Sequence, residues 1–131
     1  MAIYPNKDQI EELMKGPADQ PVVMVNLLKF KPRADESEGE ATGQVAYGRY
    51  AEKMREVVES QGGRFIWFGR VDSNVIGENG DPEFDVIGLV EYPSRQKFIE
   101  IAGSQKVRDI GEHRSAGLEM QWLSATTEAQ M

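Results

Sequence analysis

The amino-acid sequence predicts one α+β domain whose elements follow the order strand, helix, strand, strand, helix, strand. Residues 22–30, VVMVNLLKF, are apolar at both parities, which is typical of a strand buried on both faces. Apolar residues then keep helical spacing over 45–61. Two runs rich in branched and aromatic residues, 64–71 and 84–92, flank a turn-forming segment. This βαββαβ order predicts a ferredoxin-like fold, a four-stranded antiparallel sheet with the first and third strands in its centre and both helices on one face.

The segments before the first long helix follow from capping and turn signals. Asn6 and Gln9 resemble a capping box, which predicts a short leading helix that ends before Gly16 and Pro17. Residues 31–43, KPRADESEGEATG, are polar and lack an apolar period, so they predict a mobile surface loop.

The last third of the chain predicts a broken helix and a final strand. Ser94 follows a proline and starts the helix, which is interrupted at 103–104 and resumes to Gly117. The final strand is predicted over 118–123, and residues 124–131 are predicted to fray. The domain therefore spans 1–131 with a core of about 21–123, and turn residues at 79–82 separate the second and third strands.

Composition excludes several classes of function. The net charge of −7 lacks the basic footprint of a nucleic-acid binder, and no apolar run is long enough to cross a membrane. The absence of cysteine removes disulfides and thiolate metal sites, and a single histidine removes multi-histidine sites. No motif indicates a cofactor or a bound metal, and no leader is recognised, so the expected location is the cytoplasm.

Strand pairing predicts a charged cluster at one end of the sheet. Antiparallel pairing sets Lys29 near Asp85, and the second strand brings Arg70 to the other side of that carboxylate. The predicted catalytic residues are His113, Asp85 and Lys29, and the predicted ligand-binding residues are Arg114, Arg70 and Glu119. The alternative is a rim of ordinary surface ion pairs, worth about 0–1 kcal/mol each. For His113, a favourable position in the last turn of a helix is a further alternative.

The opposite parity predicts an apolar face that seats the helices. This face contains Asn26 of the first strand, Trp67 of the second, and the glycines and valines of the second and third strands. Met120 and Trp122 of the last strand belong to it as well. Asn26 is then a buried amide that binds nearby backbone or a tyrosine such as Tyr50. If the two faces are inverted, Asn26, Trp67 and Trp122 line a pocket, with the Tyr50 hydroxyl as a further donor.

Four stretches resemble a known family. PVVMVNLLKFKP, AYGRYAEKM, LVEYPSRQKF and HRSAGLEMQWL are similar to members of the domain of unknown function 1330 family, within the dimeric α/β-barrel superfamily. The resemblance covers about 21–123. It implies a homodimer whose two sheets pack face to face into a barrel, with a pocket on the inner face of each sheet. The superfamily includes cofactor-independent monooxygenases, heme-degrading enzymes, lactone isomerases and binding proteins, so the fold alone does not select a function.

Three hypotheses follow. The first is a homodimer that binds a small anionic or aromatic metabolite, in one version as a cofactor-independent enzyme. The second is a non-catalytic binding or structural dimer whose charges serve solubility and strand register. The third is a heme-binding or heme-degrading protein that uses Asn26, Trp67 and His113, residue types that heme-degrading members of the superfamily also use.

Overall fold

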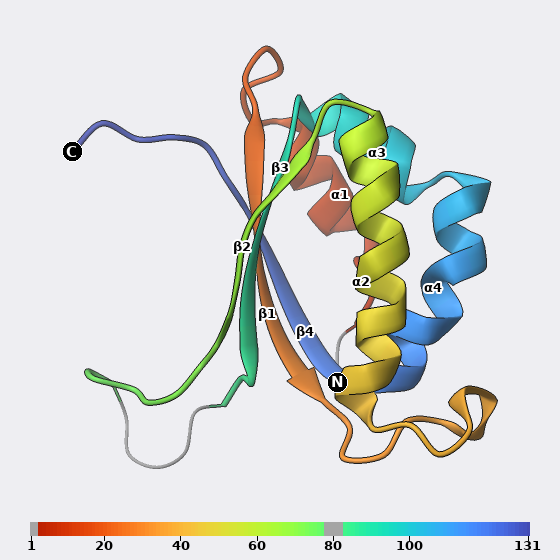
Figure 1. The fold of residues 1–131 in the computed structure, drawn as a ribbon. Helices are drawn as coiled ribbons and strands as arrows, with labels where there is room; N and C mark the ends of the chain where they lie inside the picture. The colour runs from red at the N-terminus through yellow and green to blue at the C-terminus, as the bar shows by residue number, and fades with distance from the viewer. Residues whose placement is uncertain (1–2, 78–82) are drawn as a thin grey trace.

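A four-stranded antiparallel sheet carries all of the long helices on one of its faces (Figure 1). The computed structural model describes residues 3–77 and 83–131, so the predicted turn at 79–82 lies outside the described residues. The strand order is β2-β3-β1-β4, as predicted. The elements are α1 (Lys7–Met14), β1 (Val22–Phe30), the 3-10 turn η1 (Glu36–Glu38), α2 (Gly43–Ser60), β2 (Arg64–Arg70), β3 (Val86–Tyr92), α3 (Arg95–Ala102), α4 (Gln105–Gly117) and β4 (Leu118–Thr126).

Side-chain caps define where the helices begin. The Asn6 capping box starts α1, and the hydroxyls of Thr42, Ser94 and Ser104 accept from backbone N–H groups in the first turns of α2, α3 and α4. The predicted break between the last two helices is confirmed, because Gly103 ends α3 and Ser104 caps α4.

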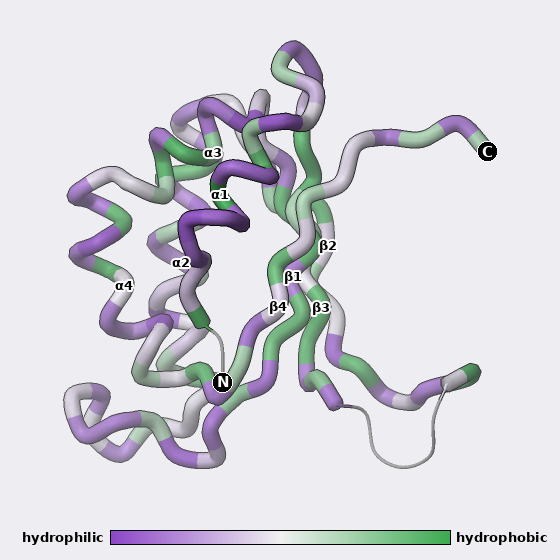
Figure 2. The backbone as a smooth tube through the Cα atoms, turned by 180° about the vertical axis from the view of Figure 1, so that it is seen from behind, coloured by the Kyte–Doolittle hydropathy of each residue, from purple (hydrophilic) through white to green (hydrophobic). Residues whose placement is uncertain are grey.

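The even-numbered residues of β1 face the helices, as the sequence predicts. Val22, Met24, Asn26 and Leu28 are buried, whereas the residues between them are partly exposed. The buried apolar residues form two groups, one around Val58 and Ile101 and one around Leu28 and Leu118. Figure 2 shows the strands as the most continuously hydrophobic part of the chain, with hydrophilic residues along the helices.

Both tryptophans lie on the helix-free face, which corrects the predicted parity. A bulge at Ile66 sets Trp67 opposite Leu89, and Trp122 lies opposite Leu27. Directly opposite residues project to the same face, and Leu27 and Leu89 belong to the helix-free side. Trp67 is 63% exposed and Trp122 54% exposed. This bulge, and a second irregularity where β4 pairs with Lys29 and Phe30 of β1, move Gly69 and Met120 away from the predicted face, to positions opposite Ile87 and Lys29.

Strand β4 is three residues longer than predicted. Residues 124–126 continue the ladder with β1, and the hydroxyl of Thr126 donates to the backbone oxygen of Val23 at 2.7 Å. The polar sequence of residues 124–126 carries no strand signal. Backbone pairing with the central strand β1 is nevertheless sufficient to extend β4.

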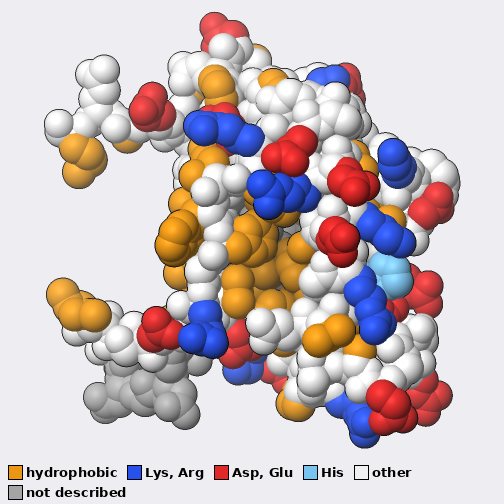
Figure 3. Space-filling view, viewed as in Figure 1, with side chains coloured by type: hydrophobic (Ala, Val, Ile, Leu, Met, Phe, Trp, Pro, Cys, Tyr) orange, Lys and Arg blue, Asp and Glu red, His pale blue; other side chains and the backbone are white. Residues whose placement is uncertain are grey.

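The helix-free face is apolar at its centre. The helices, with their charged side chains, lie on the opposite side of the sheet (Figure 1). Figure 3 shows hydrophobic side chains gathered on both sides of the sheet edge, while charged side chains cover the helices. Among the described residues, no helix is both long enough and apolar enough to cross a membrane.

Candidate functional site

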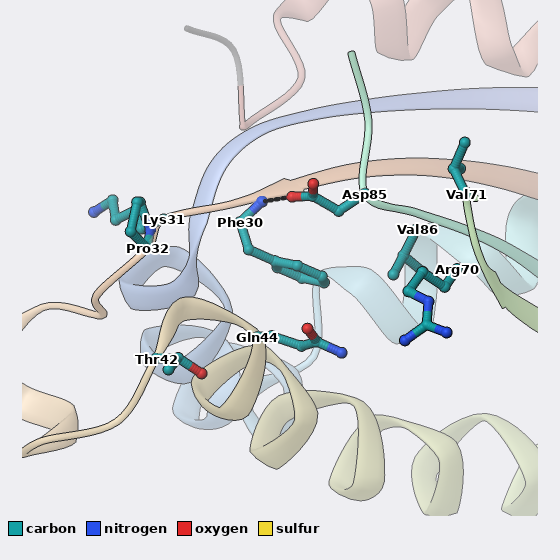
Figure 4. A pocket seen from close by; sticks show the side chains of 9 residues that line it. All are labelled: Phe30, Lys31, Pro32, Thr42, Gln44, Arg70, Val71, Asp85 and Val86. Carbon is teal, nitrogen blue, oxygen red and sulfur yellow. Dashed lines mark hydrogen bonds between the residues drawn. The ribbon is translucent and has the colours of Figure 1, made fainter. Parts of the chain in front are cut away.

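A cleft of about 440 Å³ lies where the end of the sheet meets the first turn of α2 (Figure 4). Its walls come from four elements that are far apart in the sequence. The exit of β1, the start of α2, the end of β2 and the entry to β3 contribute Phe30, Lys31, Pro32, Thr42, Gln44, Arg70, Val71, Asp85 and Val86. The lining of the cleft is therefore mixed, with apolar side chains beside polar and charged ones.

Backbone hydrogen bonds fix Asp85 between two strands. Its N–H donates to the oxygen of Leu28 at 2.7 Å, and its own oxygen accepts from the N–H of Val71 at 2.9 Å. Its carboxylate oxygen Oδ2 accepts from the N–H of Phe30 at 2.8 Å, the bond drawn in Figure 4. The carboxylate thus continues the ladder where β1 leaves the sheet, and its other oxygen has remaining acceptor capacity.

Arg70 supplies the cleft with a cation that is only weakly paired with another side chain of the protein. Its Nε lies 3.4 Å from Oδ1 of Asp72, and the two side chains are 82% and 80% exposed. Such an exposed pair contributes little. Figure 4 shows the Arg70 guanidinium and the Gln44 amide directed into the same space, beside the Phe30 ring.

The predicted charged cluster is divided into separate sets of contacts. The backbones of Lys29 and Asp85 are neighbours, as predicted, but no ion pair within residues 3–77 and 83–131 joins any two of its six members. Lys29 has the parity of the helix-free face, whereas the Asp85 carboxylate turns to the backbone of Phe30. Only Arg70 and Asp85 of the six line the cleft, and Glu119 lies beside the β1–β4 irregularity.

His113 forms a buried contact that sequence reasoning missed. Its Nδ1 lies 2.8 Å from both carboxylate oxygens of Glu38, and Arg49 donates to Oε1 of the same carboxylate at 3.1 Å. The Glu38 side chain is 2% exposed. Burial acts to raise the pKa of this carboxyl, but the hydrogen bonds from His113 and Arg49 outweigh it, so the pKa lies below the ordinary glutamate value. Glu38 comes from the predicted mobile loop, where ESEGE shows no apolar pattern to mark a buried residue.

Arg114 belongs to a chain of hydrogen bonds that ends at the centre of the sheet. Its Nη2 donates to Oε1 of Gln121 at 2.9 Å and to the backbone oxygen of Ile3. Nε2 of Gln121 donates to Oδ1 of Asn26 at 2.8 Å, and the Asn26 amide donates to the oxygens of Met24 and Gly88. The predicted buried amide bound to backbone is confirmed, with Gln121 as its side-chain partner in place of Tyr50.

The remaining predicted residues are in different surroundings. Tyr50 packs beside Tyr47 with its ring centroid 5.4 Å away, and burial raises the pKa of both phenols. Of the three residues considered for heme, Trp67 lies on the helix-free face, Asn26 lies beneath the helices and His113 is bound to Glu38. None of the three lines the cleft beside α2.

The strand order and the single helical layer define a ferredoxin-like α+β fold. The family model of the domain of unknown function DUF1330 matches residues 37–126. The chain belongs to this family, which confirms the resemblance noted from its sequence. No functionally curated protein matches the chain.

Solved structures extend the likeness over nearly the whole chain. RPA0582 from Rhodopseudomonas palustris, described as a protein of unknown function, is 29% identical, with a TM-score of 0.86 over 98% of both chains. Methylated RPA0582 is 30% identical, with a TM-score of 0.87 over 98% of this chain and 96% of that one. SnoaB, a cofactor-independent oxygenase from Streptomyces nogalater, is 12% identical, with a TM-score of 0.54 over 86% of this chain and 96% of its own. This last likeness concerns the fold alone.

Proposed function

We propose that this protein binds a small carboxylate that has an apolar or aromatic body, in the cleft between the end of the sheet and α2. The observation that carries the proposal is Arg70, a weakly paired guanidinium that lines a cleft together with apolar side chains. A volume of about 440 Å³ falls within the usual range for small-molecule sites, about 300–1,000 Å³.

Each part of the cleft corresponds to a part of such a ligand. The planar fork of Arg70 matches a carboxylate in two parallel hydrogen bonds. Phe30 and Val86 offer apolar surface to a ring, and the free acceptor capacity of Asp85 suits a hydroxyl donor. A hydroxylated aromatic acid is therefore the probe that uses all three features.

Titration with 4-hydroxybenzoate tests the proposal. Perturbed amide resonances are expected at the cleft residues, while phenol and acetate, which each lack half of the probe, bind more weakly. Arg70→Ala is expected to weaken binding about tenfold or more, since a hydrogen bond to a charged group contributes about 1.5–3 kcal/mol. Arg108→Ala is the control, because it removes the same charge from an exposed position on α4. Equal weakening in both variants, or no saturable binding, would contradict the proposal.

An enzymatic version assigns Asp85 the role of acid or base toward the bound hydroxyl. It is the one predicted catalytic residue that lines the cleft, because neither Lys29 nor His113 is among the lining residues. SnoaB is a cofactor-independent oxygenase on the same fold, so oxygen consumption is the activity to measure with the bound probe. Binding without turnover would favour the binding-protein hypothesis.

The same proposal includes a homodimer formed through the helix-free face. Exposed Trp67, Trp122 and Ile87 support it, because a soluble monomer seldom presents so continuous an apolar sheet face. A dimer that binds none of the probes would favour the structural alternative.

A further inference from the structure

The segment between β1 and α2 forms one wall of the cleft. We call residues 31–42 the cleft loop; Lys31 and Pro32 at its start and Thr42 at its end line the cleft. The loop turns away from the cleft between these ends and passes through η1. Its composition is polar, and most of its residues are exposed.

Glu38 is the only charged residue of the cleft loop that is buried. Its carboxylate meets two cationic or proton-donating groups from the helical layer, His113 of α4 at 2.8 Å and Arg49 of α2 at 3.1 Å. Arg49 also donates to the backbone oxygen of Glu38 at 3.1 Å. Because a carboxylate only accepts hydrogen bonds, Nδ1 of His113 carries the proton in this contact.

The other contacts of the cleft loop are exposed ion pairs and backbone hydrogen bonds. Two ion pairs within it, Lys31 with Asp35 and Arg33 with Glu40, are solvent-accessible. Backbone bonds hold its base, from Ala34 to Ala41 and from Asp35 to the oxygen of Ala116. A buried carboxylate that loses its partners is strongly destabilised, so the Glu38 contacts hold the middle of the loop more tightly than its surface pairs do.

We infer that Glu38 is a positioning residue, which holds the cleft loop against α2 and α4 and thereby sets the cleft wall. Ligand affinity then depends on Glu38, His113 and Arg49, although none of the three lines the cleft. The effect on affinity rests on the proposed binding function, whereas the fastening of the loop is a property of the free protein.

Hydrogen exchange and binding test the two parts separately. In Glu38→Gln, the Ala34 and Asp35 amides are expected to exchange at least tenfold faster than in the natural chain, while the central amides of β1 keep their rates. Glu36→Gln is the matched control, because it removes the same charge from an exposed position two residues away. Affinity for 4-hydroxybenzoate is expected to fall severalfold in Glu38→Gln and to stay unchanged in Glu36→Gln.

A second variant covers the case in which Glu38→Gln does not fold. Arg49→Gln removes one of the two partners of Glu38. Because the Arg49 side chain is itself partly exposed, a smaller acceleration of exchange is expected at the Ala34 and Asp35 amides. Unchanged loop exchange in the folded variants, or equal acceleration in Glu36→Gln, would overturn the inference. Absence of 4-hydroxybenzoate binding to the natural chain would instead refute the proposed function, and loop exchange would still decide the role of Glu38.

Discussion

Glu38 shows how one buried charge can organise a polar segment. Its two partners come from different helices, so the carboxylate joins the cleft loop to both α2 and α4 at one point. An uncharged residue of the same size would fill the space but would form weaker bonds to Arg49 and His113. The negative charge is therefore the property that matters at this position.

The contribution of Glu38 to stability is expected to depend on pH. Its pKa in the folded protein lies below the ordinary value, so the folded state favours the ionised form. The stabilisation is fully present above the unfolded value, about 4.3, and is lost as the pH falls through the lower, folded value. The melting temperatures of the natural chain and Glu38→Gln should therefore differ most clearly above the unfolded value and converge once the pH falls below the folded one.

The Glu36→Gln variant again serves as the control for this pH series. Glu36 is exposed, so its replacement should leave the melting temperature nearly unchanged at each pH. A constant difference between the natural chain and Glu38→Gln down to the acid limit would contradict the assigned pKa direction.

Asn26 and Glu38 differ in how far their burial can be predicted from the sequence. Asn26 is a polar residue within an apolar strand, and that contrast is sufficient to predict a buried, hydrogen-bonded amide. Glu38 is an acidic residue among other acidic and small residues, so nothing local distinguishes it from its exposed neighbours. Its burial arises from α2 and α4, whose positions relative to the loop follow only from the folded chain.

At the scale of elements, strand parity was reliable where the ladder is regular. The alternation along β1 correctly assigned Asn26 and Lys29 to opposite faces. It failed beyond the irregularities in β2 and β4, because one extra residue reverses the faces of all residues that follow. The order of the strands and α-helices and the strand order of the sheet agree with the prediction, since these depend on periodicity and topology and not on single-residue register.

Two glycines allow α2 and α4 to approach closely next to the cleft loop. A Cβ atom on Gly117 would lie 2.4 Å from the backbone oxygen of Gly43, and one on Gly43 would lie 2.6 Å from that of Gly117. Backbone atoms cannot move aside as a flexible side chain can. The contact therefore fixes the start of α2, which borders the cleft, against the end of α4.

Alanine substitutions within α4 should have opposite effects at its two glycines. Gly117→Ala is expected to destabilise the fold by about 1–3 kcal/mol, because the added methyl group overpacks the contact with α2. Gly111→Ala is expected to stabilise it by about 0.5–1 kcal/mol, because a Cβ there meets nothing within 4 Å and alanine favours the helix. Chemical denaturation measures both, and a stability gain in Gly117→Ala would contradict the close contact.

At the scale of the whole molecule, the two faces of the sheet are unequal. Helices cover one face, whereas the other presents both tryptophans. The segment that follows β2 and the C-terminal end of the chain both extend to the helix-free side (Figure 1). In the first of these segments Val75 and Ile76 are 92% and 95% exposed. Apolar residues therefore project beyond this face as well as covering it, which is the arrangement expected of a surface that a second copy covers.

A charge at the centre of this face should separate the proposed homodimer. Ile87 lies on the central strand β3 opposite Leu27 and is exposed in the single chain, so Ile87→Lys leaves the helix-side core intact. Burying an unpaired ammonium in an apolar interface is strongly unfavourable. Sedimentation is expected to give twice 14.7 kDa for the natural chain and 14.7 kDa for Ile87→Lys.

Val45→Lys adds the same charge to an exposed apolar position on α2 and should remain dimeric. If this control dissociates equally, the effect of the added charge would not be specific to the helix-free face, and the proposed interface would lose its support. A natural chain that sediments at 14.7 kDa would refute the homodimer itself. Because the cleft lies at the end of the sheet, 4-hydroxybenzoate titration of Ile87→Lys would further show whether the cleft is complete within one copy.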